Sequence, residues 1–187
     1  MKSKRGYVVL VLTFIIVFSF FYYQFNFSKV GIYNKVSKQD GYVVTEIQKP
    51  ITFTTFIKPE WFPQGSNKEN KLNIELAKIG RVGIKIEKII DRGDDIYFSF
   101  DDIPYIKYKE GEYLSSYVMN EDGAFTSYSL VDAFTVFASN SEVNIGQNGV
   151  GPDSKFGFCI SKNDFETIKN GFTLVYKGSV YYKYTKN

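Results

Sequence analysis

Residues 82–100 read VGIKIEKIIDRGDDIYFSF and carry the clearest structural pattern in the chain. Ile84, Ile86 and, after Lys88, Ile90 recur with period two, the periodicity of a strand with one buried face, which predicts that these three residues are buried. Asp91-Arg92-Gly93-Asp94 supplies turn-forming residues, and Ile96 to Phe100 follows as a second apolar run. The stretch therefore predicts an antiparallel hairpin.

Short strand-like segments separated by turn residues continue on both sides of this hairpin. They lie at 42–57 (interrupted by Pro50), 73–79, 113–119, 125–131, 133–137, 143–145, 156–160, 172–176 and 180–184. The last two, joined by Lys177-Gly178, predict a second hairpin. The chain is rich in Phe (18) and Tyr (15), which favour pleated, half-buried surfaces. We therefore expect an all-β domain, an antiparallel sandwich of which the immunoglobulin-like arrangement is one form.

An uncharged, largely apolar segment precedes this domain, from Tyr7 to Tyr23. Extended to Phe27, it has the length of a membrane-spanning helix, which needs about 17–25 residues. The basic residues Lys2, Lys4 and Arg5 precede it and predict that the N-terminus stays in the cytoplasm. A single-pass inner or plasma membrane protein with an extracytoplasmic C-terminal domain is therefore expected.

Residues 20–27 read FFYYQFNF and lack the small residues of a signal-peptide cleavage site. We therefore expect an uncleaved signal anchor, with a cleaved signal peptide as the alternative. The predicted organisation is a basic tip at 1–6, a transmembrane helix at 7–27, a linker at 28–41 and the extracytoplasmic β domain at 42–187.

Lys4-Arg5-Gly6-Tyr7, followed by apolar residues, resembles the processing site of type IV pilin-like proteins. The resemblance covers only the N-terminus and is a third interpretation of the membrane segment. Those proteins usually carry Glu five residues into the mature helix, where this chain has Val11. Their helix also continues well past the membrane, whereas Gly31 and Gly41 punctuate this one.

Composition excludes several kinds of chemistry. The chain has no His, which excludes Ser–His and Cys–His catalytic pairs and imidazole metal sites. Its single cysteine, Cys159, excludes an intrachain disulfide and is expected to be a small buried hydrophobe. The net charge of +3 belongs to the N-terminal tip, because the rest of the chain has 20 basic and 20 acidic residues. No nucleic-acid partner is therefore expected.

Two groups of aromatic residues are candidate partner contacts. Trp61 and Phe62 lie between two prolines in a polar loop, where large apolar side chains are exposed unless the loop folds back and buries them. Tyr105 and Tyr108 belong to a second concentration of aromatic residues. Tyrosine offers a stacking face and a hydroxyl group, which suits protein or carbohydrate binding.

Two loops contain residue types that are common in ligand sites. Asp91, Asp94 and Asp95 lie close enough in sequence to converge on calcium, but their spacing matches no calcium loop and turn formation explains them. The glycine-rich segment 146–154 differs from a phosphate-binding loop in its Ser–Lys order and in Pro152. We expect no cofactor and no metal.

No acid–base pair of side chains is recognisable in the sequence, so the protein is not expected to be an enzyme. We expect a membrane-tethered, non-catalytic binding or adaptor domain of a bacterial envelope, with a protein partner. Abundant Lys, Asn, Ile and Tyr, typical of AT-rich genomes, suggest the bacterial source. The alternatives are a periplasmic immunity-type protein that neutralises a toxin and an envelope enzyme that uses two carboxylates.

Overall fold

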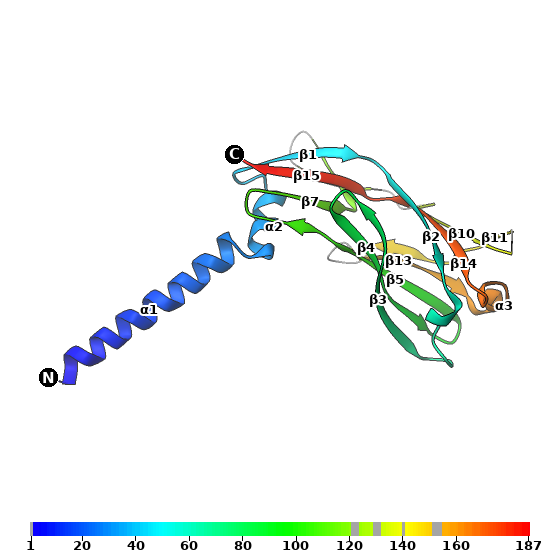
Figure 1. Ribbon diagram of the computed structural model, residues 1–187, viewed down its shortest axis with the longest axis horizontal. Coiled ribbons are helices and arrows are strands. Elements are labelled where there is room, and N and C mark those ends of the chain that lie inside the picture. The colour runs from blue at the N-terminus through cyan, green and yellow to red at the C-terminus, as the bar shows by residue number, and fades with distance from the viewer. Residues whose placement is uncertain (1, 121–123, 129–131, 140, 151–154) are drawn as a thin grey trace. The chain divides into compact units, whose positions relative to one another are not determined.

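The computed structural model describes residues 2–120, 124–128, 132–139, 141–150 and 155–187 (Figure 1). The chain divides into two compact units. The helical unit comprises Met1–Val44, Ile106–Gly111 and Tyr184–Asn187, and the β unit comprises Thr45–Tyr105 and Glu112–Lys183. The structure is mostly β, with antiparallel sheets and one N-terminal apolar helix. This confirms the predicted fold class at that level.

The N-terminal helix α1 (Lys2–Asn26) is regular and uncovered. Its segment Gly6–Asn26 is long and apolar enough to cross a membrane, and none of that segment is buried within the protein. The Thr13 hydroxyl donates to the Val9 carbonyl (2.9 Å), which satisfies a polar group of the apolar segment within the helix itself. The helix therefore has the length, composition and internal hydrogen bonding of a membrane span.

A second helix, α2 (Lys29–Ser37), occupies much of the segment predicted as a linker. The Ser28 hydroxyl caps it by accepting a hydrogen bond from the Gly31 amide (3.0 Å). Gly31 lies so close to the end of α1 that a Cβ there would be 2.4 Å from the Gln24 carbonyl oxygen. With Ile32 and Val36 buried as well, this segment is a packed helix rather than an extended tether.

The strands that the structure describes form four sheets, with orders β1-β15-β7-β6, β11-β10-β14-β2, β12-β13-β5-β4-β3 and β8-β9. Their bounds are β1 (Tyr42–Gln48), β2 (Ile51–Ile57), β3 (Glu69–Ile79), β4 (Val82–Asp91), β5 (Asp95–Ile103), β6 (Tyr105–Ile106), β7 (Glu110–Ser115), β8 (Tyr117–Met119), β9 (Phe125–Ser127), β10 (Phe134–Ala138), β11 (Ser141–Val143), β12 (Asn148–Val150), β13 (Phe156–Ser161), β14 (Phe172–Gly178) and β15 (Val180–Lys186). Short helical turns lie at Pro59–Trp61 (η1), Lys162–Asp164 (η3) and Phe165–Ile168 (α3). Parts of the predicted strand at 125–131 and of the glycine-rich segment at 146–154 fall outside the described residues.

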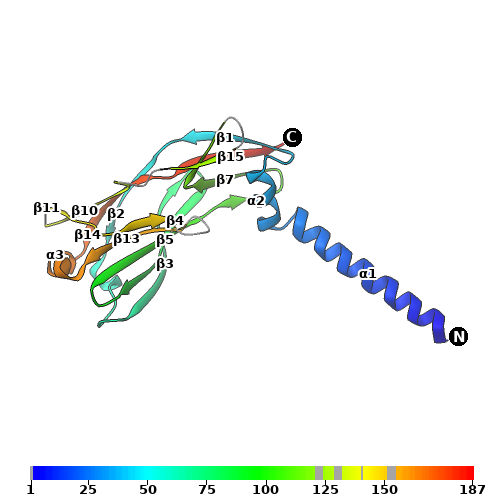
Figure 2. The same cartoon turned by 180° about the vertical axis from the view of Figure 1, so that it is seen from behind.

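The predicted hairpin at 82–100 is confirmed. β4 and β5 pair antiparallel from Gly83 opposite Ile103 to Asp91 opposite Ile96, and both views show them with β3 as neighbours (Figures 1 and 2). The register shifts between Ile86 and Lys88, which is the signature of a β-bulge. Beyond this shift the fully buried residue is Ile89 and not Ile90, which is only half-buried.

The predicted second hairpin is wrong, because β14 and β15 lie in different sheets. β14 pairs with β10 and β2, whereas β15 lies between β1 and β7. The chain changes sheet at Ser179, which has a φ of +55°. The Ile51 amide donates to the Ser179 carbonyl (3.2 Å), so β1 and β2 change sheet at the same level, around Pro50. The predicted strand at 42–57 is therefore two strands, one of the arrangements expected from Pro50.

Aromatic side chains from two sheets form the core of the β unit. The rings of Phe156 (β13) and Tyr176 (β14) lie 4.7 Å apart, and those of Phe98 (β5) and Phe172 (β14) lie 5.2 Å apart. Buried residues alternate with outward-facing residues along β14, as the sequence periodicity predicts, whereas β13 is buried continuously from Phe156 to Ile160. Cys159 is buried and free, so the core stands without a disulfide, as expected.

A buried carboxylate holds the turn between β3 and β4. Glu112, 3% exposed, accepts hydrogen bonds from the Arg81 amide (2.7 Å), the Arg81 Nε (2.8 Å) and the Tyr181 hydroxyl. Burial alone would raise the pKa of Glu112, but the hydrogen bonds from Tyr181 and Arg81 outweigh it and lower the pKa to about 2. The carboxylate therefore stays ionised and links β7, in which it lies, to β15 and to the turn between β3 and β4.

Gly80, at this turn, is required by both conformation and space. Its φ is +57°, and an added Cβ would lie 2.0 Å from the Tyr181 hydroxyl oxygen and 2.6 Å from Glu112 Oε2. We expect Gly80→Ala to lower the free energy of unfolding by about 3 kcal/mol, of which roughly 1–2 kcal/mol is the left-handed backbone and the rest the displaced hydrogen bonds. Urea unfolding of the full chain in detergent measures the change.

Gly149→Ala is the matched control, because its added Cβ would meet no atom within 4 Å. We expect it to change the free energy of unfolding by less than about 0.5 kcal/mol. Equal losses in the two variants would contradict the role assigned to the Glu112 contacts.

Candidate interaction surface

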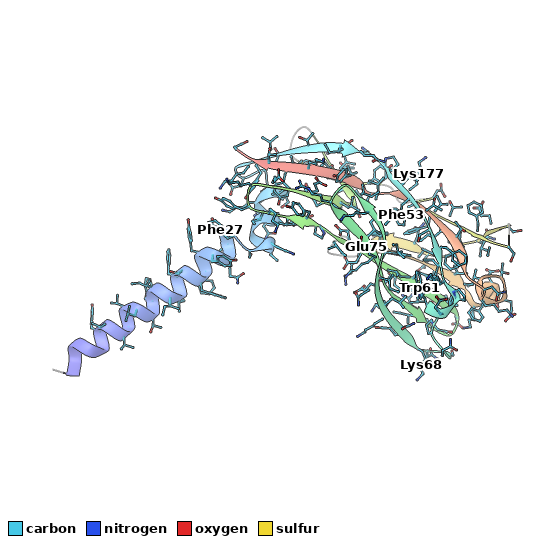
Figure 3. The ribbon with its side chains drawn as sticks, viewed as in Figure 1. Phe27, Phe53, Trp61, Lys68, Glu75 and Lys177 are labelled. Carbon is cyan, nitrogen blue, oxygen red and sulfur yellow. The ribbon has the colours of Figure 1, made fainter. Side chains whose placement is uncertain are left out.

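The structure separates the two aromatic residues of the predicted loop contact. Phe62 is 5% exposed and packs edge-on against Phe98 and Phe165, so the loop folds back and buries it. Trp61 stays half-buried in the loop between β2 and β3, with the Lys58 ammonium 5.8 Å from its ring (Figure 3). Of this pair, only Trp61 presents part of its ring to solvent.

The two predicted tyrosines lie in different surroundings. Tyr105 is half-buried in the β unit, with the Arg81 guanidinium 4.1 Å above its ring. Tyr108 belongs to the helical unit, is 37% exposed, and contacts Phe27 (4.8 Å between ring centroids) and the Lys186 ammonium (3.7 Å from the ring centroid). Tyr105 therefore completes the Arg81 turn, whereas Tyr108 is a surface residue.

The outward face of the β10-β14-β2 strands is uncharged at its centre and carries two exposed phenylalanines. We call it the Thr/Phe face, and its residues are Thr52, Thr54 and Phe56 of β2, Thr173 and Val175 of β14, and Thr135 and Phe137 of β10. Strand register makes this surface contiguous, because paired residues of neighbouring strands share a face. All of its residues belong to the β unit.

The residues of the Thr/Phe face form two rows across the strands. In the first row Thr173 is paired with Phe137 on one side and Phe56 on the other, which places the two phenylalanines roughly 10 Å apart, two strand spacings. Phe56 is 49% exposed and Phe137 is 41% exposed. In the second row Val175 lies between Thr135 and Thr54. Aromatic and β-branched side chains at this density on an exposed sheet are typical of a binding surface.

Charged residues stand only at the margins of the Thr/Phe face. Lys177 follows Val175 on the same side of β14 and is paired with Thr52 (Figure 3). Glu142 of β11 is paired with Phe137. The centre of the face therefore has no charge to desolvate when a partner covers it.

The outward face of the β5-β4-β3 strands contrasts with the Thr/Phe face, because ion pairs cover it. They join Lys85 to Asp101 (3.3 Å), Lys88 to Glu69 (3.4 Å) and Lys155 to Glu87 (2.8 Å). The hydrogen bond from Lys155 holds the pKa of Glu87 below its usual value. Such a face is well solvated, so the Thr/Phe face is the better candidate for contact with a partner.

β2 adds a second feature to the Thr/Phe face, because it is the edge of its sheet. Among the strands that the structure describes, β14 is the one that pairs with β2, and the outer edge of β2 pairs with none. An edge of this kind offers backbone N–H and C=O groups to an extended segment of another chain. The exposed Thr52, Thr54 and Phe56 lie along that edge.

The aspartates at 91, 94 and 95, which the sequence explains by turn formation rather than calcium binding, lie at the β4–β5 turn. Asp91, 4% exposed, accepts hydrogen bonds from the Lys162 ammonium and from the Gly93 amide (2.9 Å). Burial raises the pKa of Asp91, but these hydrogen bonds outweigh it and hold the pKa below its usual value. Within the described residues, no group of three His, Cys, Asp or Glu side chains is placed to hold a metal ion. The turn and the Lys162 ion pair therefore account for Asp91.

Asp102 is the one described carboxyl group whose pKa is raised well above its usual value. It is 9% exposed and shares the inward side of β5 with Phe98 and Phe100. Burial, together with the neighbouring charge of Asp101, raises the pKa of Asp102 to about 7. The Asp101 carboxylate points to the opposite side of the sheet, where it pairs with Lys85. The two carboxyl groups therefore do not face each other as a hydrolytic pair would.

Phe56 and Phe137 were not identified from the sequence. Phe56 belongs to the run ITFTTFI, in which threonines alternate with buried apolar residues, and that alternation was the available signal for an outward Thr/Phe strand. The row that contains Phe56 and Phe137 depends on strand register, which brings together residues 81 positions apart in the sequence.

The chain matches no protein-family model, no curated protein and no solved structure.

Asp102 predicts an unusual pH dependence of stability. Because the folded-state pKa of Asp102, about 7, lies above the usual value of 3.8, ionisation of this carboxyl group opposes folding. The free energy of unfolding is therefore highest below about pH 4, where Asp102 is protonated in both the folded and the unfolded chain. It falls by at most about 4 kcal/mol as the pH rises towards 7. We therefore expect Asp102→Asn to raise the free energy of unfolding at pH 8 by about 2–4 kcal/mol, and to change it by less than about 1 kcal/mol at pH 4.5.

Urea unfolding of the full chain in detergent at both pH values measures this difference. Asp94→Asn is the control, because that side chain is exposed at the turn between β4 and β5, and its replacement should change stability by less than about 1 kcal/mol at either pH. A stabilisation by Asp102→Asn that is the same at pH 4.5 and pH 8 would show that the buried carboxyl does not titrate in this range.

Proposed function

We propose that this chain is a membrane-tethered, non-catalytic binding domain of a bacterial envelope, with the β unit outside the cytoplasm. The uncovered apolar surface of α1 supports the anchor. The basic residues at positions 2, 4 and 5 favour a cytoplasmic N-terminus, because cationic flanks are retained there. The bulky residues at 20–27 favour an uncleaved helix.

We also propose that two sheets, β11-β10-β14-β2 and β12-β13-β5-β4-β3, form a sandwich. The ring contacts of Phe156 with Tyr176, and of Phe98 with Phe172, support this arrangement because each joins one sheet to the other. A sandwich has two outward faces. Here ion pairs cover the face formed by the β5-β4-β3 strands, and the other is the Thr/Phe face. The immunoglobulin-like form is not needed for the functional argument.

The observation that carries the binding function is the Thr/Phe face. Its partner is a protein, because a flat surface of aromatic and β-branched side chains next to an open strand edge suits a strand or sheet of another chain. An exposed pair of phenylalanines roughly 10 Å apart can supply the few contacts that dominate such an interface. The uncharged centre favours an apolar surface on the partner.

Site-specific photo-crosslinking in the native cells tests this proposal. A photoreactive phenylalanine analogue replaces Phe137 in the full-length chain, and the matched control carries it at Ile103, which is similarly exposed (44%) on the ion-paired face. We expect a discrete protein adduct from position 137 and none from position 103. The identity of the captured protein distinguishes an adaptor from an immunity-type protein.

Phe56→Ser in the chain with the analogue at 137 measures the contribution of the second phenylalanine. We expect the adduct to fall about tenfold, because loss of one central aromatic contact weakens binding by about 1–2 kcal/mol. Fold and stability should be unaffected, since Phe56 is exposed. Equal adducts from positions 137 and 103, or none from either, would overturn the binding face.

A further inference from the structure

Basic side chains from three distant parts of the sequence belong to the helical unit. They are Lys29, Lys35 and Lys38 in and after α2, Lys107 and Lys109 between β6 and β7, and Lys186 of β15. The same segments contain two acidic residues, Asp40 and Glu110, so the helical unit carries a net charge of +4 beyond α1. The β unit has 14 basic and 18 acidic residues, a net charge of −4. The sequence after the N-terminal tip is neutral as a whole, but the helical unit is positively charged and the β unit is negatively charged.

Buried tyrosines fix the segment that carries Lys107 and Lys109. The Tyr184 hydroxyl donates to the Lys107 carbonyl (2.8 Å) and accepts from the Lys107 amide (3.0 Å). The Tyr42 hydroxyl donates to the Tyr108 carbonyl (3.0 Å). The Lys186 amide donates to the Lys109 carbonyl (2.7 Å), which joins the third segment. These contacts hold the lysines in one folded structure rather than on separate loops.

Aromatic and apolar side chains connect this basic group to the end of α1. The ring of Phe27, the residue after α1, lies 4.8 Å from the ring of Tyr108, and the Lys186 ammonium lies 3.7 Å from the same ring. Both rings are more than one-third exposed, and Val30 on α2 is 70% exposed. Such a mixture of cations, aromatic rings and an exposed aliphatic residue suits the boundary between water and lipid.

We propose that these residues form a site for the headgroups of anionic phospholipids, at the surface of the membrane that α1 crosses. The site, here called the cationic collar, consists of Lys29, Lys38, Lys107, Lys109 and Lys186 with Phe27, Val30 and Tyr108. Lys29 follows the end of α1 by three residues, and the other lysines belong to the same compact unit.

Charge determines which lipids the collar selects. Lysines within a Debye length of an anionic surface, about 8 Å at physiological ionic strength, are attracted to it, and several acting together bind it strongly. The net charge of −4 on the β unit opposes binding to the same surface, so attraction is confined to the collar. The inference rests on the proposed membrane anchor and does not depend on the Thr/Phe face.

Native mass spectrometry of the full-length chain tests the collar. The chain, purified in a mild non-ionic detergent, receives an equimolar mixture of phosphatidylglycerol and phosphatidylcholine of the same acyl chains, and the retained lipids are counted. We expect phosphatidylglycerol to be retained about tenfold more than phosphatidylcholine at low salt, and equally at high salt, because screening removes the attraction of several lysines.

Two triple variants with the same change of charge locate the site. The collar variant carries Lys107→Gln, Lys109→Gln and Lys186→Gln, and the control carries Lys68→Gln, Lys71→Gln and Lys78→Gln, three exposed lysines of the β unit. We expect the preference for phosphatidylglycerol to disappear in the collar variant and to persist in the control. Circular dichroism checks that both variants keep the β fold.

The outcomes that contradict these expectations distinguish loss of the cationic collar from loss of the membrane anchor. Equal retention of the two lipids by the natural chain at low salt, or equal loss of preference in both triple variants, overturns the collar and leaves the anchor intact. A chain that stays soluble without detergent and retains neither lipid overturns the anchor, and the collar with it.

Discussion

The apolar side chains of α1 from Gly6 to Asn26 are exposed along the whole helix, and this surface constrains the rest of the molecule. Transfer of so many apolar residues from water into lipid is strongly favourable, and a helix satisfies its own backbone hydrogen bonds there. Once α1 lies in a membrane, the residues that directly follow it must fit the lipid–water boundary. Phe27, Val30 and the lysines of the helical unit meet that requirement.

The β unit solves a different problem, stability without a disulfide. Its core consists largely of aromatic rings such as Phe98, Phe156 and Tyr176, which stack between two sheets. Because alternate residues of each strand are committed to this core, the outward residues are free to differ between the sheets. One sheet uses them for ion pairs, and the other presents threonines and two phenylalanines. This division of the two faces is the basis of the proposed binding function.

Local patterns in the sequence identified the features that depend on neighbouring residues. The hairpin at 82–100 was predictable because its two strands and its turn are contiguous, and the apolar segment at 7–27 because length and composition define it. The prediction of a second hairpin is wrong because Ser179 adopts a left-handed backbone conformation, and the chain enters another sheet after it. A β-bulge after Ile86 moves Ile90 out of the core, and the pattern of apolar residues in the sequence does not indicate this bulge.

The candidate sites were harder to predict, because they depend on contacts between distant segments. Trp61 and Phe62 are adjacent in sequence, yet one stays half-exposed and the other fills the core. The Thr/Phe face needs the register of β10, β14 and β2. The chain after Arg5 has equal numbers of basic and acidic residues, but their unequal distribution between the two units follows only from the folded chain.

We propose that an uncleaved α1 holds the β unit outside the cytoplasm, and both the proposed function and the proposed lipid site depend on this anchor. Carbonate extraction of bacterial membranes followed by proteolysis of spheroplasts tests it most directly, using an antibody against the β unit. The account predicts that the full-length chain stays with the membrane at alkaline pH and that external protease removes the β unit from intact spheroplasts. Release of a chain shortened at its N-terminus, or full protection until the spheroplasts are lysed, would contradict it.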